Sequence, residues 1–102
     1  MFDIVLDDAL YGHFNTIDRK DRRLILDIIE KQLTYEPAIQ TQNRKPLRIP
    51  NTLNATWELR CGTNNRYRVF YDVDIESRVV VVLAVGRKIR NALWIGGEEI
   101  RL

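Results

Sequence analysis

The sequence predicts an α+β domain: an N-terminal strand, two helices, then a three- to four-stranded, mostly antiparallel sheet with the helices packed on one face. Three observations support this prediction. Apolar residues recur at helical spacing across residues 24–33, apolar and polar residues alternate across 57–74, and residues 79–86 form one continuous apolar run. Helical spacing indicates an amphipathic helix, and alternation indicates a strand with one buried face.

The first part of the chain supplies the predicted helices. FDIVLD, residues 2–7, has the pattern of a short strand, and residues 8–14 can form a brief helix. Asp18 is a good N-cap for a longer helix, with a second acid at Asp21. This helix should end before Pro37, because the residue ahead of a proline is steered away from helical geometry. Its apolar stripe comprises Leu24, Ile25, Ile28, Ile29 and Leu33.

The second part supplies the sheet. Residues 37–54 contain all three prolines and little periodicity, which predicts a long loop that is functional or packs as a unit. Strands are predicted at residues 55–61, 66–74 and 79–86, with a short last strand near 93–95. The 79–86 run does not alternate, which is typical of a central strand buried on both faces.

The composition fits one domain spanning residues 1–102, with 45% apolar residues. The net charge is +2, but seven basic and three acidic residues give residues 60–90 a charge of +4, which favours a polyanionic partner. Cys61 lies on the apolar face of a predicted strand, so we expect a buried thiol. We find no signal-peptide pattern and no membrane-spanning run, and we expect a cytoplasmic protein with no membrane partner.

The face opposite the predicted core carries Arg60 and Arg68, with Glu58 and Phe70 beside them. If the helices cover the core face, this second face is uncovered, and a ligand would bind there. Arginines on a sheet face are either ordinary solvated surface or an anion site.

Two strand registers keep the core residues on one face. In the first, Arg60 lies opposite Arg68, which costs roughly a few tenths of a kcal/mol to 1 kcal/mol and would suit a bidentate phosphate clamp. In the second, a three-residue loop at residues 62–64 places Glu58 opposite Arg68 as an ordinary cross-strand ion pair. We favour the second register, because surface ion pairs are common.

Five short motifs in the second part of the chain occur in a characteristic order. They are NRKPLR, LR before a short turn, YRVFYDVD, VVVVLAVGRKIRN and, near the end, IGGEE. Together they resemble the RelE/ParE superfamily of bacterial toxin–antitoxin toxins. RelE-like members are small endoribonucleases that enter the ribosomal A site and cleave the bound mRNA without metal or cofactor. The resemblance implies this fold, inhibition of translation, and a cognate antitoxin, the ribosome and mRNA as partners.

The resemblance also implies functional residues. Arg68 matches the arginine that contacts the scissile phosphate, Arg60 matches a basic residue after the preceding strand, and Lys88 falls where RelE carries a second catalytic arginine. Thr56 and Glu58 replace two RelE lysines, and Glu58 is on the correct face to act as the base. We expect the three cations just after the valine-rich strand to lie on the same side as Arg68. The residues expected to contact RNA are Arg87, Arg90, Lys45, Arg48 and Trp94.

Two departures from the RelE pattern leave other functions open. Trp94 stands where RelE has a tyrosine, and Lys45, Pro46 and Leu47 lack the glutamate that some relatives use as a general base. One alternative is a ParE-type toxin that binds DNA gyrase. The other is a RelE-like domain that retains only its antitoxin-binding surface.

Overall fold

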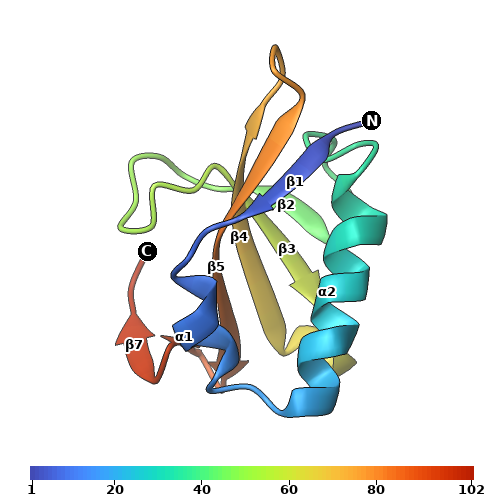
Figure 1. Cartoon of the computed structure of the whole chain (residues 1–102). Helices are drawn as coiled ribbons and strands as arrows, with labels where there is room; N and C mark the ends of the chain where they lie inside the picture. The colour runs from blue at the N-terminus through green and yellow to red at the C-terminus, as the bar shows by residue number, and fades with distance from the viewer.

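The computed structural model describes all 102 residues and confirms the α+β class (Figure 1). The helices are α1 (Leu10–Phe14) and α2 (Arg19–Leu33), and a one-turn 3-10 helix, η1, covers Thr63–Asn65. The sheet has seven strands, more than the three or four predicted. The strands are β1 (Asp3–Leu6), β2 (Arg44–Pro46), β3 (Trp57–Cys61), β4 (Tyr67–Asp74), β5 (Val79–Ile89), β6 (Ala92–Ile95) and β7 (Glu98–Ile100).

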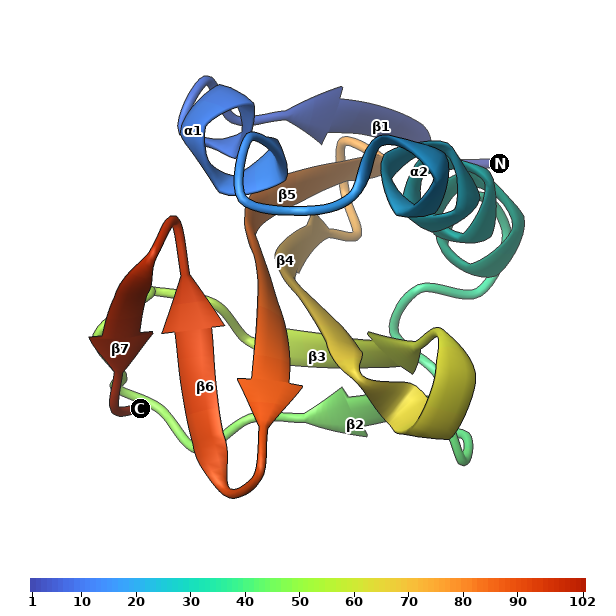
Figure 2. The ribbon, with the colours of Figure 1, turned by 90° about the horizontal axis from the view of Figure 1, so that it is seen from below.

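Strand β5 is the centre of the sheet. The strands follow the order β2-β3-β4-β5-β6-β7 with antiparallel neighbours, while β1 runs parallel to β5. β1 and β6 share one edge of β5, because β1 pairs with residues 79–82 and β6 with residues 87–89. Figure 2 shows that the sheet curls strongly, so that β2 and β3 run across the direction of β5 and β6.

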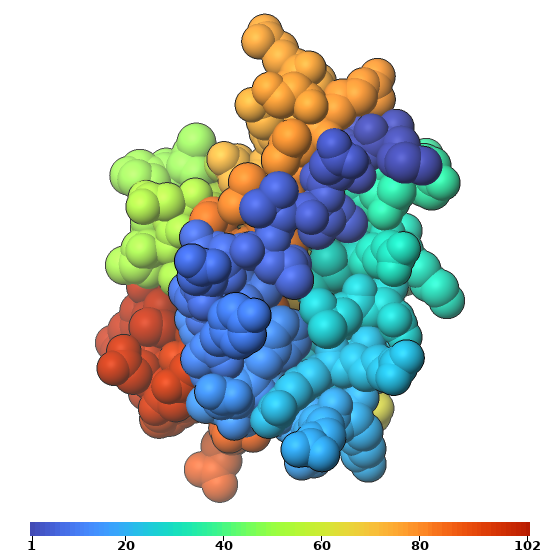
Figure 3. Space-filling model, viewed as in Figure 1, coloured from blue at the N-terminus to red at the C-terminus, as the bar shows by residue number.

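The helices cover one face of the sheet, as predicted. Ile25, Ile29 and Leu33 of α2 are buried in a core that they share with side chains of β3, β4 and β5. These three residues repeat every four positions and define the buried stripe. Leu24, which the sequence placed in that stripe, is 44% exposed because it lies one position away from this line. From the helical side, the segment from β1 to α2 forms most of the visible surface (Figure 3).

Two tyrosine hydroxyls of β4 tie the sheet to α2 and its exit loop. The Tyr67 hydroxyl donates to the Asp21 carboxylate, and the Tyr71 hydroxyl donates to the Pro37 carbonyl at 2.7 Å. Asp18 precedes α2 as expected, but its side chain makes no capping hydrogen bond. The acid in the first turn therefore acts through β4, which fixes the helix against the sheet.

A second, smaller core lies on the opposite face of the sheet. Phe70 is only 1% exposed there, although the sequence predicted an uncovered face. The loop after β2 and the β6–β7 hairpin fold over this end of the face, and Thr52 of the loop donates to the Arg101 carbonyl at 3.0 Å. The part of the face near Arg60 stays accessible, because the Arg60 side chain is 38% exposed. The members of the second core are Ala55, Phe70, Ala84, Leu93 and Ile95, with Leu47, Leu53, Leu83 and Ile100 packed around them.

Gly86, which ends the valine-rich run, lets β6 approach β5 closely. A Cβ at this position would lie 2.7 Å from both the Ile95 side chain and the Trp94 carbonyl oxygen. Such contacts are too short for any side chain, so the residue facing Arg68 across the β4–β5 ladder must be glycine.

Candidate functional site

Strands β3 and β4 pair in the first of the two registers considered from the sequence. Arg60 lies directly opposite Arg68, and Glu58 lies opposite Phe70. The expectation that Glu58 directly opposes Arg68 is therefore wrong. Two arginines face each other across an antiparallel ladder, an arrangement that is unfavourable unless a counter-charge lies nearby.

The turn between β3 and β4 decides this register. It spans five residues, 62–66, instead of the three needed for the other register. Gly62, Asn64 and Asn65 have φ values of +80°, +57° and +54°. Glycine and asparagine adopt this left-handed region most readily, so the sequence GTNN favours a wider turn that a hydrophobic pattern does not reveal.

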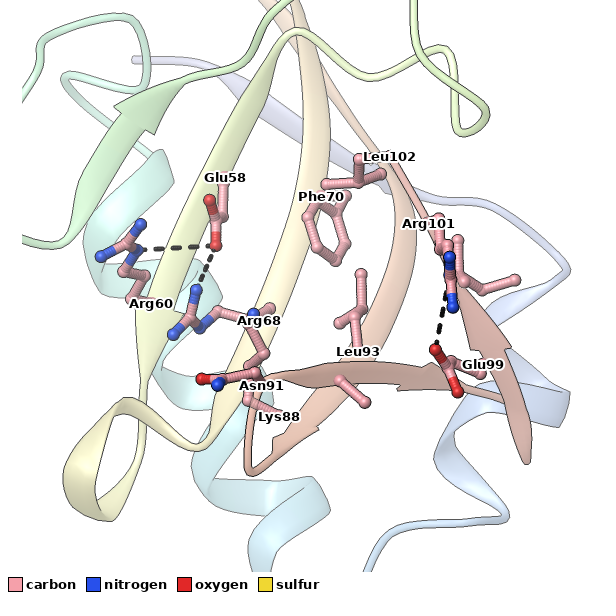
Figure 4. A pocket seen from close by; sticks show the side chains of 12 residues that line it. Glu58, Arg60, Arg68, Phe70, Lys88, Asn91, Leu93, Glu99, Arg101 and Leu102 are labelled. Atoms are coloured by element: carbon pink, nitrogen blue, oxygen red, sulfur yellow. Dashed lines mark hydrogen bonds and ion pairs between the residues drawn. The ribbon is translucent and has the colours of Figure 1, made fainter.

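Glu58 supplies the counter-charge for both arginines. Its Oε1 lies 2.6 Å from Arg68 Nη1 and 3.5 Å from Arg60 Nε (Figure 4). Glu58 is two residues before Arg60 on β3 and diagonal to Arg68 across the ladder, a spacing that long side chains can bridge. The directly opposed arginines and the Glu58–Arg68 ion pair therefore exist together, although the sequence presented them as alternatives.

The protein encloses most of this arginine–glutamate cluster, and Arg60 is its most exposed member. The side chains of Arg68 and Glu58 are 13% and 10% exposed, and that of Arg60 is 38% exposed. Arg68 Nε also donates to the Asn65 carbonyl at 3.1 Å, whereas the buried Arg60 Nε has no hydrogen-bond partner. A buried donor without a hydrogen-bond partner costs free energy, and the Glu58 carboxylate at 3.5 Å offsets this only in part.

A hollow of about 460 Å³ opens above the cluster (Figure 4). One wall is cationic, with Lys88 and Asn91 beside Arg68, and the other is formed by apolar residues of the second core and the C-terminal residues. Four cations and two carboxylates line it, so the charged side chains contribute a net +2. The lining residues are Glu58, Arg60, Arg68, Phe70, Lys88, Asn91, Ala92, Leu93, Glu99, Ile100, Arg101 and Leu102. A cationic wall facing an apolar wall suits a nucleotide, which has a charged phosphate and an apolar base face.

Cys61 and the two core tyrosines lie on the far side of the sheet from this hollow. Burial raises the pKa of the Cys61 thiol to about 11, although the Arg68 charge acts in the opposite direction. Burial, with the hydrogen bond to Asp21, raises the pKa of Tyr67 to about 12. Burial also raises the pKa of Tyr71. Cys61 is a buried free thiol, which confirms the expectation from the sequence.

The structure brings four of the predicted site residues together and separates the others. Glu58, Arg60, Arg68 and Lys88 line one hollow. Lys45 lies directly opposite Glu58 on β2, next to the cluster but outside the hollow.

The remaining predicted contacts divide between the two faces of the sheet. Arg87 pairs with Tyr67 on β4 and with Trp94 on β6, so it belongs to the opposite face from Lys88. The expectation that Arg87 lies on the same side as Arg68 is wrong, because adjacent strand residues point to opposite faces. Trp94 shares the face of Arg87 and does not line the hollow, and Arg48 is exposed in the loop after β2.

Sequence reasoning missed two arginines near the site. Arg44 is 8% exposed and donates to the Ile39 carbonyl, the Gln32 carbonyl and the Gln32 side chain, which anchors β2 to the end of α2. Arg66, in the β3–β4 turn, lines a second hollow with Arg68 and Lys88. The sequence signal for Arg66 was its position in a turn of polar residues. Using that signal required the length of the β3–β4 turn, which the hydrophobic pattern does not reveal.

No three or more His, Cys, Asp or Glu residues come together in a group that could hold a metal ion. Neither helix is long and apolar enough to cross a membrane.

Comparison with known proteins defines first a fold and then a family. The chain has the fold of a chain in the crystal structure of the toxin–antitoxin complex RelBE2 from Mycobacterium tuberculosis, with a TM-score of 0.67 and 24% sequence identity. The match covers 85% of this chain and 98% of the other chain. The resemblance to RelE-like toxins is thus confirmed at the level of the fold.

The family model for phage-derived Gp49-like proteins matches residues 13–93. The matched segment contains α2 and β2 to β5, and it includes Glu58, Arg60, Arg68 and Lys88. The chain belongs to the Gp49-like family. No curated protein sequence gives a significant match.

Proposed function

We propose that this chain is the toxin of a toxin–antitoxin pair and that it cleaves mRNA bound in the ribosomal A site, in the cytoplasm. The observation that carries the proposal is the Arg60–Glu58–Arg68 cluster, with Lys88 beside it, in a hollow large enough for a nucleotide. The fold shared with a chain of a toxin–antitoxin complex supports the same assignment.

The arginines are suited to bind the scissile phosphate. Guanidinium groups donate in a planar fork that matches two phosphate oxygens, and a pair of them can hold the extra negative charge of a pentavalent phosphorane. Arg60 is held less tightly than Arg68, because its Nε lies 3.5 Å from Glu58 Oε1 and makes no hydrogen bond. In the free protein Glu58 occupies both arginines, so RNA binding would exchange a carboxylate for a phosphate at the same donors.

This exchange would also release the general base. Both ion pairs of Glu58 end on Oε1. When a phosphate takes over the arginines, the Glu58 carboxylate becomes available to accept the proton of the neighbouring 2′-hydroxyl. A positioned general base contributes roughly 10²- to 10⁴-fold to the rate. Because the base must first leave its ion pairs, we expect slow cleavage.

The proposed reaction uses no group from outside the protein and the RNA. Glu58 takes the proton of the 2′-hydroxyl, the 2′-oxygen attacks the adjacent phosphorus, and the bond from phosphorus to the 5′-oxygen breaks. Lys88 donates a proton to the departing 5′-oxygen, because an ammonium group can release a proton and the arginines cannot. The products are a 2′,3′-cyclic phosphate and a 5′-hydroxyl.

The antitoxin is proposed as a second partner. Exposed apolar side chains border a hollow between β1, α1 and α2, and they include Leu6, Tyr11 and Leu26 at 43%, 81% and 39% exposure. Large apolar side chains gathered on one surface are typical of a protein interaction site. An antitoxin segment bound here would lie on the opposite face of the sheet from the RNA hollow.

The test separates the nuclease from the gyrase-binding alternative. The purified chain is incubated with ribosomes that carry a defined mRNA, and the mRNA 5′ ends are mapped; in parallel, supercoiling by DNA gyrase is measured. We expect new 5′ ends within the A-site codon and unchanged supercoiling. Intact mRNA together with inhibited supercoiling would establish the gyrase alternative instead.

A further inference from the structure

A second hollow, of about 670 Å³, lies next to the arginine–glutamate cluster, between the β3–β4 turn and the β5–β6 turn. Four cations and no acidic residue line it. We call this hollow the cationic cup. Its lining includes Asn64, Asn65, Arg66, Arg68, Lys88, Arg90 and Asn91.

Three cations of the cationic cup have no protein counter-charge. The ion pairs of the chain involve Arg60, Arg68 and Arg101, so Arg66, Lys88 and Arg90 take part in none. This contrasts with the neighbouring hollow, where Glu58 neutralises the arginines. Several unpaired cations around one concave surface give a local positive potential, which attracts an anion with more than one charged group.

The two turns that form the cationic cup are fixed to each other. Lys88 N donates to the Arg66 carbonyl at 2.7 Å, and the Arg66 guanidinium lies 5.6 Å from the centre of the Tyr67 ring. Asn64, Asn65 and Arg90 have φ values of +57°, +54° and +58°, so both turns have defined left-handed positions. A fixed backbone limits the positions that the arginine side chains can reach, which lowers the entropy lost on binding.

The cationic cup is continuous with the proposed catalytic hollow. Arg68, Lys88 and Asn91 line both of them. An RNA chain whose scissile phosphate lies on Arg60 and Arg68 can therefore place a neighbouring phosphate in the cationic cup. Lys88 stands between the two, and in the proposed reaction it protonates the 5′-oxygen, which belongs to the nucleotide on the 3′ side of the cut.

We propose that the cationic cup binds the phosphodiester on the 3′ side of the scissile bond of the substrate RNA. The proposal rests on the proposed function for the direction of the RNA, but the binding itself does not require cleavage. RNA phosphates of the ribosome have the same chemistry, so the experiment must separate substrate RNA from ribosomal RNA.

The first arm measures binding without cleavage. Fluorescence anisotropy gives the Kd of a single-stranded RNA 10-mer at several KCl concentrations for the wild type, the double variant Arg66→Ala/Arg90→Ala, and the control Arg23→Ala, an exposed arginine of α2 outside both hollows. We expect the double variant to bind about tenfold more weakly, with a log–log salt slope smaller by about 0.7 for the lost phosphate contact. The control should match the wild type.

The second arm uses ribosomes to test the direction in which the RNA lies across the two hollows. A neutral methylphosphonate replaces one linkage of the mRNA, either directly 3′ or directly 5′ of the mapped cut. We expect only the 3′ replacement to slow cleavage by the wild type, and neither to slow the double variant further. Sensitivity to the 5′ replacement alone would overturn the direction.

Two outcomes distinguish a failure of the cationic-cup proposal from a failure of the proposed function. If the double variant binds the 10-mer with unchanged Kd and slope and loses only ribosome co-sedimentation, the proposal is wrong and the partner is ribosomal RNA. If the wild type binds the 10-mer through Arg66 and Arg90 but cuts no mRNA, the proposed function fails and RNA binding by the cationic cup stands.

Discussion

The two adjoining hollows differ in how their cations are held. In the first, Arg60 and Arg68 share one buried carboxylate, and Arg68 is 13% exposed. In the second, Arg66 and Arg90 are exposed and have no acidic neighbour in the lining. The same residue type thus serves two purposes. Under the proposed function, the ion-paired arginines stabilise the transition state, while the unpaired and exposed ones provide affinity that salt can screen.

The difference also explains why a like-charge pair is tolerated in the middle of a sheet. Glu58 offsets the repulsion between Arg60 and Arg68 at a cost to their positive potential. The unpaired cations next to them, Arg66, Lys88 and Arg90, restore a positive potential around the two hollows. Under the proposed function, the ion-paired arginines hold the scissile phosphate and the unpaired cations attract the RNA, with Lys88 bordering both hollows.

Removing Arg68 should give the largest effect. Arg68→Ala deletes a donor to the transition state, and we expect mRNA cleavage to fall by about 10²- to 10³-fold. Because the buried Glu58 loses its closest partner, we also expect the free energy of unfolding to fall by about 1–3 kcal/mol in urea titrations. Arg66→Ala is the matched control and should change the free energy of unfolding by no more than about 0.5 kcal/mol. Equal destabilisation by both variants would show that the two regions are not held differently.

Neutralising Glu58 should change binding and catalysis in opposite directions. Glu58→Gln keeps the shape of the side chain but removes the negative charge, which makes the first hollow resemble the cationic cup. We expect the RNA Kd to fall by a few fold and the single-turnover cleavage rate to fall by about 10²-fold, because the general base is lost. A variant that cleaves faster than the wild type would show that Glu58 only inhibits the site.

In the wild-type protein, salt should weaken RNA binding but hardly change the cleavage rate. Raising KCl from 50 to 200 mM should weaken binding of the RNA 10-mer strongly, because affinity comes from exposed cations and released counterions. The cleavage rate at saturating ribosome concentration should change by less than about twofold, since the buried ion pairs are poorly screened. A cleavage rate that falls by the same factor as the RNA affinity would contradict this division.

Cys61 provides the smallest and most local test. Its thiol has a pKa raised to about 11 by burial, and the Arg68 charge opposes that shift. The native chain should therefore react slowly with iodoacetamide at pH 8 and rapidly once unfolded. Arg68→Lys keeps the positive charge and should leave the iodoacetamide reaction rate of the native chain unchanged. Arg66→Ala should also leave this rate unchanged, because the Arg66 charge does not shift the Cys61 pKa. A native rate equal to the unfolded rate would mean that the thiol is accessible.

The sequence predicted the parts of the fold that depend on periodicity. The alternation from Trp57 to Asp74 identified β3, β4 and the buried Cys61, and the apolar spacing identified α2. Two features depended on turn conformation instead. The strand register followed from the left-handed residues of the β3–β4 turn, and the small strands β2 and β7 have only three residues each, too few to show a pattern.

The candidate site was predicted in part for the same reason. Glu58, Arg60 and Arg68 come together because they share one face of two paired strands, which alternation reveals. Alternation also requires Arg87 and Lys88 to point to opposite faces, so grouping them was an error that the sequence could have corrected. The covering of Phe70 by the C-terminal hairpin required the curl of the sheet, which no local pattern encodes.

The most direct test is a mutant cycle on Arg60 and Arg68. Single-turnover cleavage of A-site mRNA is measured for the wild type, Arg60→Ala, Arg68→Ala and the double variant, with thermal unfolding of each as a check on folding. If both arginines hold one phosphate, either single change should lower the rate almost as much as the double change does. Two additive losses, or a double variant as active as the wild type, would contradict a shared phosphate clamp.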